Sequence, residues 1–585
     1  MSKPIYMDEK VEWVRKPKDI DANLKDYDAA YKSFKWEEVE KQFDWSRTGK
    51  VNIVHEAIDR HAAGPKKDKV ALHFTEEGRE EAYTFSDLKT LTSKFGHVLK
   101  SLGVVKGDRI AIFLPRKPEL YISVLGANRV GAIPVPLFEA FMEQAIRDRM
   151  QDSGAKVLVT TPALEGRVPF ADLPDLKVVI FVSAPGQWHG APGGIKTVVY
   201  ADEMAKATAV LEPEWLTKDD GLVIHYTSGS TGKSKGVLHR QYAMVGHYQT
   251  ALWALDLRDD DVYWCTADPG WVTGTSYGIY GPWLLGTTSV VLGGRFDPDR
   301  WYRTIQRYRV TVWYSAPTAY RMLMAAGDAV AQPHDLSSLR HICSVGEPLN
   351  PEALRWIWTL TNCPPHETWW MTETGQQLIC NYRSADFKVG ATGKPFPGTY
   401  ASVVDDEGKE VAPGTLGHLV VKPPWPSMMH SIWNNPAKFE EYFRIPGWYL
   451  SGDTAYKDAD GFIWYAGRGD DVIKTAGERV GPFEVESALV QHPAVAEAGV
   501  IGKPDALKGS IIKAFVALRP GYESSDSLKQ NIIRFTKEHL AAHAAPKELA
   551  FVAKVPKTRS GKIMRRVLRA WDEGKDPGDL STMEE

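Results

Sequence analysis

The apolar positions in the first half of the chain recur at intervals that predict alternating helices and strands. Between residues 85 and 102 they repeat at helical spacing, and Gly103 interrupts the pattern. Apolar runs at 108–115 and 131–136 predict buried strands on either side of a helical stretch at 118–129. Two further runs, AKVLVTT and LKVVIFV, continue the alternation. This order predicts α/β layers built on a largely parallel sheet.

A different pattern begins in the segment 465–482, which places four glycines and several charges between two strand-like regions. We therefore predict a large N-terminal α/β domain of several layers with parallel-rich sheets, residues 1–469, and a small α+β C-terminal domain, residues 470–585, with Asp470 near the pivot. The elements expected in the small domain are helices at 483–492 and 526–540 and strands at 494–502, 510–518 and 548–555.

The stretch from Pro269 to Gly294 contains no charged residue and raises the question of a membrane-spanning helix. It holds seven glycines, a proline and many serines and threonines, a composition that leaves backbone groups poorly organised in lipid. We therefore expect buried strand and loop around a binding site, and no membrane partner.

Composition narrows the functional classes. Hydrophobic residues make up 43% and charged residues 25% of the 585, as in soluble globular proteins. The 71 basic and 74 acidic side chains sum to −3, which does not favour general nucleic-acid binding. Cys265, Cys343, Cys363 and Cys380 form no CxxC or Cys/His cluster, and the charged N-terminus lacks the apolar stretch of a signal peptide. A reducing, cytoplasmic location is expected.

The strongest chemical signal is HYTSGSTGKSKGV, from His225 to Val237. An apolar strand leads into a loop of small and hydroxyl residues that contains Lys233 and Lys235. Small residues let backbone N–H groups approach an anion, and lysines neutralise charge, so the loop favours nucleotide phosphates. A Walker P-loop is less favoured because Thr227 stands where that motif requires a glycine, and a plain glycine–serine turn is the alternative without function.

The loop TSGSTGKSKG closely resembles the phosphate loop of the acyl-adenylate-forming enzymes, which include acyl- and aryl-coenzyme A synthetases, luciferases and peptide-synthetase adenylation domains. The resemblance runs from about Val51 to the C-terminus, and within the superfamily the chain looks most like the acetyl-coenzyme A synthetases. Further matches in the family's order are SAPTAYRML (315–323), SVGEPLNPEA (344–353), ETWWMTETG (367–375), GWYLSGD (447–453), GRGDDVIKTAGERV (467–480) and PKTRSGKIMRR (556–566).

The resemblance implies a ligase that joins acetate to the α-phosphate of ATP and passes the acetyl group to coenzyme A, with release of diphosphate and AMP. Propionate or another short acid is the alternative substrate, because one methylene is worth only about 1–3 kcal/mol of discrimination. The C-terminal domain is expected to be mobile, since two half-reactions share one nucleotide site. A silent adenylate-binding scaffold and an amino-acid-adenylating module are the other readings left open.

The same resemblance assigns the nucleotide site. Glu373 holds Mg²⁺ with ATP, Thr372 contacts the α-phosphate region, Asp453 accepts hydrogen bonds from the ribose, and Lys562 is the catalytic lysine of the adenylation step. The residues expected to bind ATP or AMP are Thr227, Ser228, Gly229, Ser230, Thr231, Gly232, Lys233, Lys235, Gly346, Glu347, Pro348, Glu367, Thr368, Trp369, Trp370, Met371, Thr372, Asp453, Arg468 and Arg479.

The acetate pocket implied by the resemblance consists of Val272, Thr273, Val345 and Trp370, and the Trp370 indole limits the acid to very few carbons. Neighbouring side chains of a strand face opposite sides, so Trp369 and Trp370 are not expected to face one pocket. The alternative without function is that Trp370 is an ordinary residue of the hydrophobic core.

Coenzyme A is expected beside Ala476, Gly477 and Lys537. Three positions depart from the family pattern: Thr275 replaces a histidine, Ala476 replaces a serine found in many relatives, and Lys537 replaces an arginine. A role for that histidine is therefore not transferred, and Lys537 keeps the charge but not the guanidinium fork.

Two histidine patterns are candidates for metal sites. His492, with the carbonyls of Val490 and Val495, matches a structural Mg²⁺ site of relatives, with a plain loop histidine as the alternative. His539 and His543 share a helix face, but surface histidines are favoured there because the glutamate that would follow the first histidine of a zinc motif is absent.

The basic run around Lys562 has two other readings. A nucleic-acid patch is not favoured, because the net charge is −3 and the adenylation motifs surround the run. Acetylation would remove the Lys562 charge, so a lysine acetyltransferase and a deacetylase are possible partners.

Overall fold

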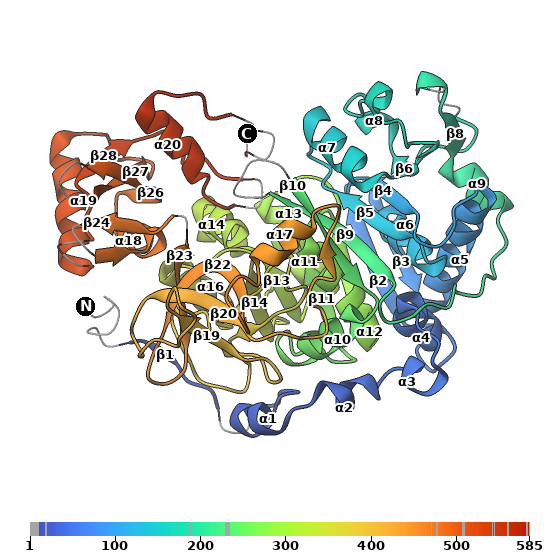
Figure 1. Cartoon of the computed structure of the whole chain (residues 1–585), viewed down its shortest axis with the longest axis horizontal. Coiled ribbons are helices and arrows are strands. Elements are labelled where there is room, and N and C mark those ends of the chain that lie inside the picture. Colours follow the sequence, from blue (N-terminus) through green and yellow to red (C-terminus); the bar gives the residue numbers. More distant parts are fainter. Residues whose placement is uncertain are drawn as a thin grey trace.

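The computed structural model describes residues 11–17, 20–187, 190, 192–228, 234–469, 471–475, 478–505, 509–540, 542, 544–558, 561–578, 580 and 583. For five of these only the main chain is described, namely Pro192, Ser228, Lys474, Glu478 and Arg479. The C-terminal lobe, which comprises the described residues from 471 onward, lies at one end of the molecule in orange and red, and the remaining residues form the large domain (Figure 1).

A parallel sheet follows the predicted alternation of the first half of the chain. Its strand order is β5-β4-β6-β7-β8, and the predicted strands at 108–115 and 131–136 are confirmed as β4 and β5. The strands are β4 Arg109–Phe113, β5 Ile133–Leu137, β6 Val157–Thr160, β7 Val178–Phe181 and β8 Lys196–Val199, and the helices between or beside them are α5 Phe85–Ser101, α6 Pro118–Arg129, α7 Glu143–Ser153, α8 Pro162–Glu165 and α9 Tyr200–Lys206.

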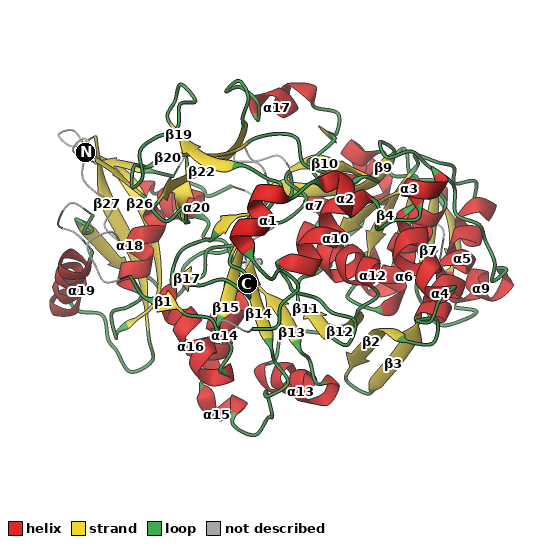
Figure 2. Ribbon diagram, turned by 90° about the horizontal axis from the view of Figure 1, so that it is seen from below, coloured by secondary structure: helices red, strands yellow, loops and turns green. Residues whose placement is uncertain are grey.

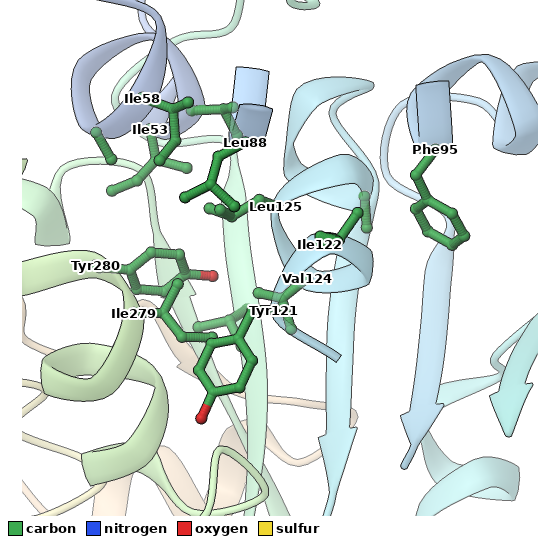
Figure 3. Packing of buried hydrophobic residues seen from close by; sticks show 14 of the residues in the cluster. Ile53, Ile58, Leu88, Phe95, Tyr121, Ile122, Val124, Leu125, Ile279 and Tyr280 are labelled. Carbon is green, nitrogen blue, oxygen red and sulfur yellow. The ribbon is translucent and has the colours of Figure 1, made fainter. Parts of the chain in front are cut away.

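Local chemistry explains where α5 begins and which face it buries. The Thr84 side chain accepts a hydrogen bond from the Asp87 N–H while Asp87 bonds back to Thr84, and this capping box starts the helix. Its apolar face, including Leu88, packs on α6 beside Leu125, as Figure 3 shows, and Tyr280 belongs to the same hydrophobic cluster. This core joins the parallel sheet to the helices that follow it in the chain.

A second and larger sheet carries the strands that end at the candidate site. Its order is β18-β16-β15-β14-β13-β11-β12-β2-β3, with parallel pairing from β2 to β15 and antiparallel strands at both edges. Its strands are β2 Val70–Glu76, β3 Arg79–Thr84, β11 Val262–Cys265, β12 Thr288–Leu292, β13 Val312–Ser315, β14 His341–Val345, β15 Pro365–Trp369, β16 Ile379–Cys380 and β18 Lys394–Pro395.

Smaller antiparallel sheets complete the large domain. Figure 2 shows the helices of this domain around its sheets and the C-terminal lobe at one end. The strands are β9 Gly221–Ser228, β10 Ser234–Arg240 and β21 Ser431–Ile432 in one sheet, β19 Ala401–Val404, β20 Gly417–Val421, β22 Tyr449–Lys457 and β23 Ile463–Arg468 in another, and β1 Trp13–Val14 paired with β17 Phe387–Lys388. The remaining helices are α1 Tyr27–Ser33, α2 Trp36–Glu40, α3 Trp45–Thr48, α4 Arg60–Ala62, α10 Ala243–Trp253, α11 Val272–Thr275, α12 Gly281–Leu285, α13 Pro298–Tyr308, α14 Pro317–Ala326, α15 Asp328–Ala331, α16 Pro351–Thr361 and α17 Pro436–Glu441, with π-helical turns at His55–Asp59 and Ser276–Tyr280 and 3₁₀ turns at Phe170–Asp172 and Pro192–Gly194.

The expectation of strand and loop for the charge-free stretch 269–294 is partly wrong. The stretch forms α11, a π-helical turn and α12 before it enters β12. Glycine spacing hid this helix, because Gly274 sits where the backbone of Asp268 and Pro269 leaves no room for a side chain. Among the described residues, no helix has the length and apolar character needed to cross a bilayer.

The C-terminal lobe has the predicted α+β composition. Its sheet has the order β25-β24-β27-β26 with β28 parallel to β27, and the final helix α20 was not predicted. Its elements are β24 Ile473–Thr475, β25 Glu478–Val480, α18 Pro482–Leu489, β26 Val495–Asp505, β27 Gly509–Leu518, α19 Asp526–His539, β28 Glu548–Phe551 and α20 Arg565–Glu573. The predicted fold class, a large α/β domain with a small α+β domain, is confirmed, whereas the pivot at Asp470 lies outside the described residues and stays a prediction.

Candidate active site

A cavity of about 890 Å³ lies where the large domain meets the C-terminal lobe. Its walls come from β9 and β10, the loops after β14 and β15, strands β22 and β23, α18 and the loop before α20. The carboxyl ends of parallel strands are the usual place for a ligand site in an α/β sheet. The predicted residues that line the cavity are Thr227, Lys235, Gly346, Glu347, Pro348, Glu367, Thr368, Trp369, Trp370, Met371, Thr372, Glu373, Asp453, Arg468, Val490 and Lys562.

Glu373 follows the carboxyl end of β15 and is only 4% exposed. Its Oε1 accepts a hydrogen bond from the Tyr442 hydroxyl at 2.7 Å and lies 2.8 Å from the Lys235 ammonium. Burial acts to raise the pKa of this carboxyl, but the Lys235 charge and the two hydrogen bonds outweigh burial and lower the pKa. Glu373 is therefore ionised at neutral pH.

Strands β22 and β23 bring Asp453 and Arg468 together, since these residues pair in the antiparallel register. Arg468 Nη1 lies 3.2 Å from Asp453 Oδ1, and the Trp369 indole N–H donates to Oδ2 at 2.9 Å. Burial raises the pKa of Asp453, and the Arg468 charge opposes the rise. The pair presents a carboxylate and a guanidinium on one wall of the cavity.

Two further carboxyl groups come from β15 and from the loop after β14. Glu367 is buried in β15, where it accepts a hydrogen bond from the Leu349 N–H, and burial raises its pKa to about 8. Glu347 accepts hydrogen bonds from the Thr318 N–H at 2.8 Å and from Arg321 at 2.9 Å. At neutral pH Glu367 is therefore mostly protonated, and the Glu347 charge is paired.

Trp370 stands directly after β15, whose last residue is Trp369. Its indole N–H donates to the Tyr314 hydroxyl at 3.1 Å, and it packs in one hydrophobic cluster with Val272 and Val345. The two neighbouring tryptophans both belong to the lining of the large cavity, but their indoles have different surroundings. Trp369 donates to Asp453 and packs against one hydrophobic cluster, whereas Trp370 donates to Tyr314 and belongs to another, as the alternation of a strand predicts.

The short helix α11 carries Thr273 and Thr275. Thr273 is half-buried and, like Val272 and Val345, is not among the residues that line the 890 Å³ cavity. Thr275 is fully buried, and its hydroxyl donates to the Pro269 carbonyl at 2.7 Å. The threonine that replaces the family's histidine is therefore bonded inside its own turn.

Lys562 lies in the loop between β28 and α20, and its side chain is open to the cavity. Desolvation by the cavity walls, and then the Arg468 charge, lower the pKa of its ammonium, while Asp453 and Glu373 act in the opposite sense. The main-chain N–H of Lys562 donates to Thr558 Oγ1 at 3.0 Å. The C-terminal lobe thus brings a cation into the cavity that is also lined by Asp453 and Glu373 of the large domain.

The contacts of His492 do not support the predicted magnesium site. One ring nitrogen lies 2.7 Å from Asn531 Oδ1, and the other accepts a hydrogen bond from a nearby backbone N–H at 3.2 Å. The Val495 carbonyl accepts a hydrogen bond from the Arg519 guanidinium at 3.0 Å, and that positive charge opposes a cation at the same oxygen. His492 thus has protein partners on both ring nitrogens, and the magnesium site stays a prediction.

Several other predicted residues are not brought to the cavity. Lys537 is exposed on α19 and does not line it, and His539 stacks on Phe535. In the described part of the chain, no group of three His, Cys, Asp or Glu side chains is placed to hold a metal ion. The predicted residues that lie outside the described ones are Gly229, Ser230, Thr231, Gly232, Lys233, Asp470, Ala476, Gly477 and His543, and the side chains of Ser228 and Arg479 are likewise not described.

Sequence reasoning missed three residues that the structure brings to the site. Tyr442 contacts Glu373, while Thr318 and Arg321 hold Glu347. The motif SAPTAYRML contains Thr318 and Arg321 and was the one signal for them, whereas nothing in the spacing around Tyr442 indicates its role. Tyr442 meets Glu373 across 69 positions of sequence, so only the fold joins them.

Comparisons with known proteins agree with this geometry. The AMP-binding enzyme family matches residues 58–433, and the AMP-binding enzyme C-terminal domain matches residues 484–562. The acetyl-coenzyme A synthetase of Bacillus subtilis (strain 168) is 57% identical over 97% of this chain and 98% of its own length. The acetyl-coenzyme A synthetase of Methanothrix thermoacetophila is 43% identical over 92% of this chain and 86% of its own length.

Solved structures extend the likeness to the fold. The crystal structure of an anthranilate–CoA ligase in complex with anthranoyl-AMP superposes with a TM-score of 0.81 at 30% identity, over 89% of this chain and 97% of that one. An acyl-CoA synthetase of Brucella canis superposes with a TM-score of 0.73 at 36% identity, over 94% of this chain and 99% of that one. The chain therefore belongs to the AMP-binding enzyme family, in the branch that contains the acetyl-coenzyme A synthetases.

Proposed function

We propose that this chain is an AMP-forming acetate–coenzyme A ligase, which converts acetate, ATP and coenzyme A into acetyl-coenzyme A, AMP and diphosphate through an enzyme-bound acetyl-adenylate. The observation that carries the proposal is a single cavity lined by Lys562, by the Lys235–Glu373 pair and by the Asp453–Arg468 pair. The 57% identity to an acetyl-coenzyme A synthetase over nearly the whole chain supports the same activity.

Adenylation forces two anions together, so the site must supply cations and fixed donors. Lys562 neutralises the acetate carboxylate and the α-phosphate at the point where the new bond forms, and Thr372 donates to the same phosphate. Lys235 binds the outer phosphates, which leave as diphosphate. The surrounding walls exclude water, which protects the acetyl-adenylate from hydrolysis.

The nucleoside binds along the wall formed by β15, β22 and the loop after β14. The Asp453 carboxylate accepts hydrogen bonds from the ribose hydroxyls, and Arg468 adds donors beside it. The adenine lies against Gly346, Glu347 and Pro348. These assignments are supported by the shared lining of one cavity and by the hydrogen bonds that hold Asp453 in place.

Magnesium accompanies ATP in the proposed reaction, and Glu373 is the residue that would hold it. The fit is good, because Glu373 is ionised, lines the cavity and shows no protein partner for Oε2 among the described residues. When bound, the ion reduces the repulsion between phosphate oxygens.

Trp370 sets the size of the acid, since its indole is fixed by Tyr314 and packs with Val272 and Val345. Kinetics of Trp370→Gly with acetate, propionate and butyrate test this role. We expect kcat/KM for the longer acids to rise about 10- to 100-fold relative to acetate, because each methylene is worth about 1–3 kcal/mol once space exists. An unchanged order of preference would remove Trp370 as the residue that limits chain length.

Thioester formation requires coenzyme A to reach the carbonyl that Lys562 has helped to activate. We propose that the C-terminal lobe turns about Asp470, so that Lys562 leaves the cavity and the segment at Ala476 and Gly477 takes its place, with Lys537 on the nucleotide of coenzyme A. The position of Lys537 away from the cavity that contains Lys562 is consistent with two separate tasks for one lobe.

The decisive experiment measures acetate-dependent exchange between ATP and pyrophosphate without coenzyme A, followed by AMP release when coenzyme A is added. The proposed function requires exchange that depends on acetate, and AMP in a 1:1 ratio with the thioester. Release of ADP would contradict it, because ADP indicates a phosphorylated acid in place of an adenylate.

We further propose that Lys562 is a target of a lysine acetyltransferase and a deacetylase in the cytoplasm. Its side chain is accessible, and acetylation removes the charge on which adenylation depends. Four unpaired cysteine thiols in the described structure fit a reducing compartment. Incorporation of acetyl-lysine at position 562 should abolish pyrophosphate exchange, and treatment with a deacetylase should restore it.

A further inference from the structure

The Glu373 carboxylate is held through one of its two oxygens. The Tyr442 hydroxyl donates to Oε1 at 2.7 Å, and the Lys235 ammonium lies 2.8 Å from the same atom. Within the described part of the chain, no hydrogen bond to Oε2 is found. All three side chains line the cavity, so the carboxylate lies at the space in which a ligand would bind.

The two partners of Oε1 differ in how firmly they are held. The Tyr442 ring stacks on Tyr449 with 5.5 Å between centroids and 4° between planes, and the Tyr442 carbonyl accepts the Leu450 N–H at 2.7 Å. Lys235 reaches Glu373 and Tyr442 at the end of a flexible side chain, with its ammonium 4.8 Å above the Tyr442 ring. Tyr442 is therefore a fixed contact of Glu373, and Lys235 is a movable one.

We propose that Lys235 is an exchangeable cation of Glu373. In the free enzyme its ammonium neutralises the carboxylate; when a divalent cation enters with the nucleotide, the ammonium moves to the polyphosphate, and Tyr442 keeps the carboxylate in position throughout. The proposal rests on the proposed function, which brings a metal–nucleotide complex to this cavity. Exchange has a physical reason, because a carboxylate that is 4% exposed is costly to leave without a positive partner.

The exchange predicts effects of opposite sign for the two partners of Glu373. In the absence of nucleotide, the Lys235 ammonium competes with a divalent cation for the carboxylate, so loss of the ammonium should strengthen metal binding. Loss of the Tyr442 hydroxyl removes a group that orients a metal ligand, so it should weaken metal binding. A merely structural role of Lys235 in the phosphate loop predicts no gain in metal affinity.

The experiment titrates full-length Lys235→Met with Mn²⁺ in the absence of nucleotide and follows the free ion by electron paramagnetic resonance. We expect binding at least about fivefold tighter than in the wild type, as removal of a competing ion pair allows. Lys235→Gln, which keeps hydrogen-bond donors without the charge, should show the same gain and provides a second variant if the first unfolds. Addition of Glu373→Gln to either variant should abolish the gained site.

Tyrosine substitutions in the Lys235→Met background isolate the second part of the proposal. Tyr442→Phe should weaken Mn²⁺ binding about tenfold, the usual cost of losing a group that orients a metal ligand. Tyr449→Phe is the matched control, because it removes the hydroxyl of the ring stacked on Tyr442, whose partner is the Met371 sulfur at 3.6 Å. It should leave the affinity within about twofold.

Two results would overturn the exchange: Mn²⁺ affinity in both Lys235 variants no higher than in the wild type, or a gained site that survives Glu373→Gln. Equal losses in the Tyr442 and Tyr449 variants would remove Tyr442 as a positioning residue. Acetate-dependent pyrophosphate exchange by the wild type is measured in parallel. An active wild type with unaltered Mn²⁺ binding in the variants refutes the exchange alone, whereas an inactive wild type refutes the proposed function.

Discussion

The two sides of the cavity hold their charged groups in different ways. On the large-domain side, Glu373 and Asp453 are each 4% exposed and accept hydrogen bonds from neighbouring side chains. On the side of the C-terminal lobe, Lys562 has an accessible side chain, and its main chain bonds to Thr558 through both the N–H and the carbonyl. The carboxylates of the large domain are thus held by neighbouring groups, whereas the Lys562 ammonium is open to the cavity; under the proposed function this difference separates a fixed nucleotide wall from a catalytic cation that is presented to it.

Within the C-terminal lobe, ion pairs join the helix that follows Lys562 to other elements. Arg565 at the start of α20 makes two hydrogen bonds to Glu486 at 2.6 and 2.7 Å, and Arg569 pairs with Asp471, the residue after the predicted pivot. These ion pairs connect the helix that follows Lys562 to the rest of the lobe. If the lobe rotates as proposed, the contrast teaches that one site can combine fixed recognition of a nucleotide with a charge that a rigid body withdraws.

The largest expected effect comes from Lys562→Ala. It should lower acetate-dependent pyrophosphate exchange about 10²- to 10³-fold, as expected when one donor to developing charge is lost. The rate of thioester formation from supplied acetyl-adenylate should change less than about threefold, because the second half-reaction does not use the Lys562 charge. Lys575→Ala, at a side chain that is 72% exposed, serves as the surface control. Equal damage to both half-reactions would refute the divided role.

A smaller effect is expected where the lobe touches the large domain. Gly561 has φ = +87°, and a Cβ placed on it would lie 1.6 Å from Thr318 Oγ1. Gly561→Ala should therefore displace the turn that carries Lys562 from its contact with the large domain. We expect roughly a tenfold loss of pyrophosphate exchange, in keeping with the cost of misplacing a catalytic group. Gly574→Ala introduces a similar backbone strain at φ = +64° with nothing within 4 Å. Similar losses in both variants would show that strain, not the contact, is responsible.

The last expected effect concerns the stability of the fixed wall and not activity. Burial raises the pKa of Glu367 from 4.5 to about 8, so its contribution to stability is complete below pH 4.5 and is lost as the pH rises toward 8. Between pH 5.5 and 7.5 the unfolding free energy of the wild type should therefore fall relative to Glu367→Gln, by at most about 1.4 kcal/mol per pH unit. Urea unfolding at several pH values measures this difference, and parallel curves would contradict a buried, protonated Glu367.

The sequence predicted the periodic parts of the fold well. The helix at 85–102, the strands at 108–115 and 131–136 and most of the C-terminal lobe are present, because apolar spacing reports directly which face is buried. It failed at 269–294, where glycines that allow close backbone contact resemble the glycines of a loop. The rule of alternating faces held at Trp369 and Trp370, whose indoles contact Asp453 and Tyr314 in two different hydrophobic clusters.

What the sequence determined by itself is the order of elements, the fold class and, through its motifs, the chemistry of individual residues such as Glu373, Asp453 and Lys562. What only the tertiary structure decided is which groups touch: Tyr442 on Glu373, and Gly561 against Thr318. The physical reason is that spacing along the chain encodes local burial, whereas contacts between distant segments arise only when sheets and domains pack against one another.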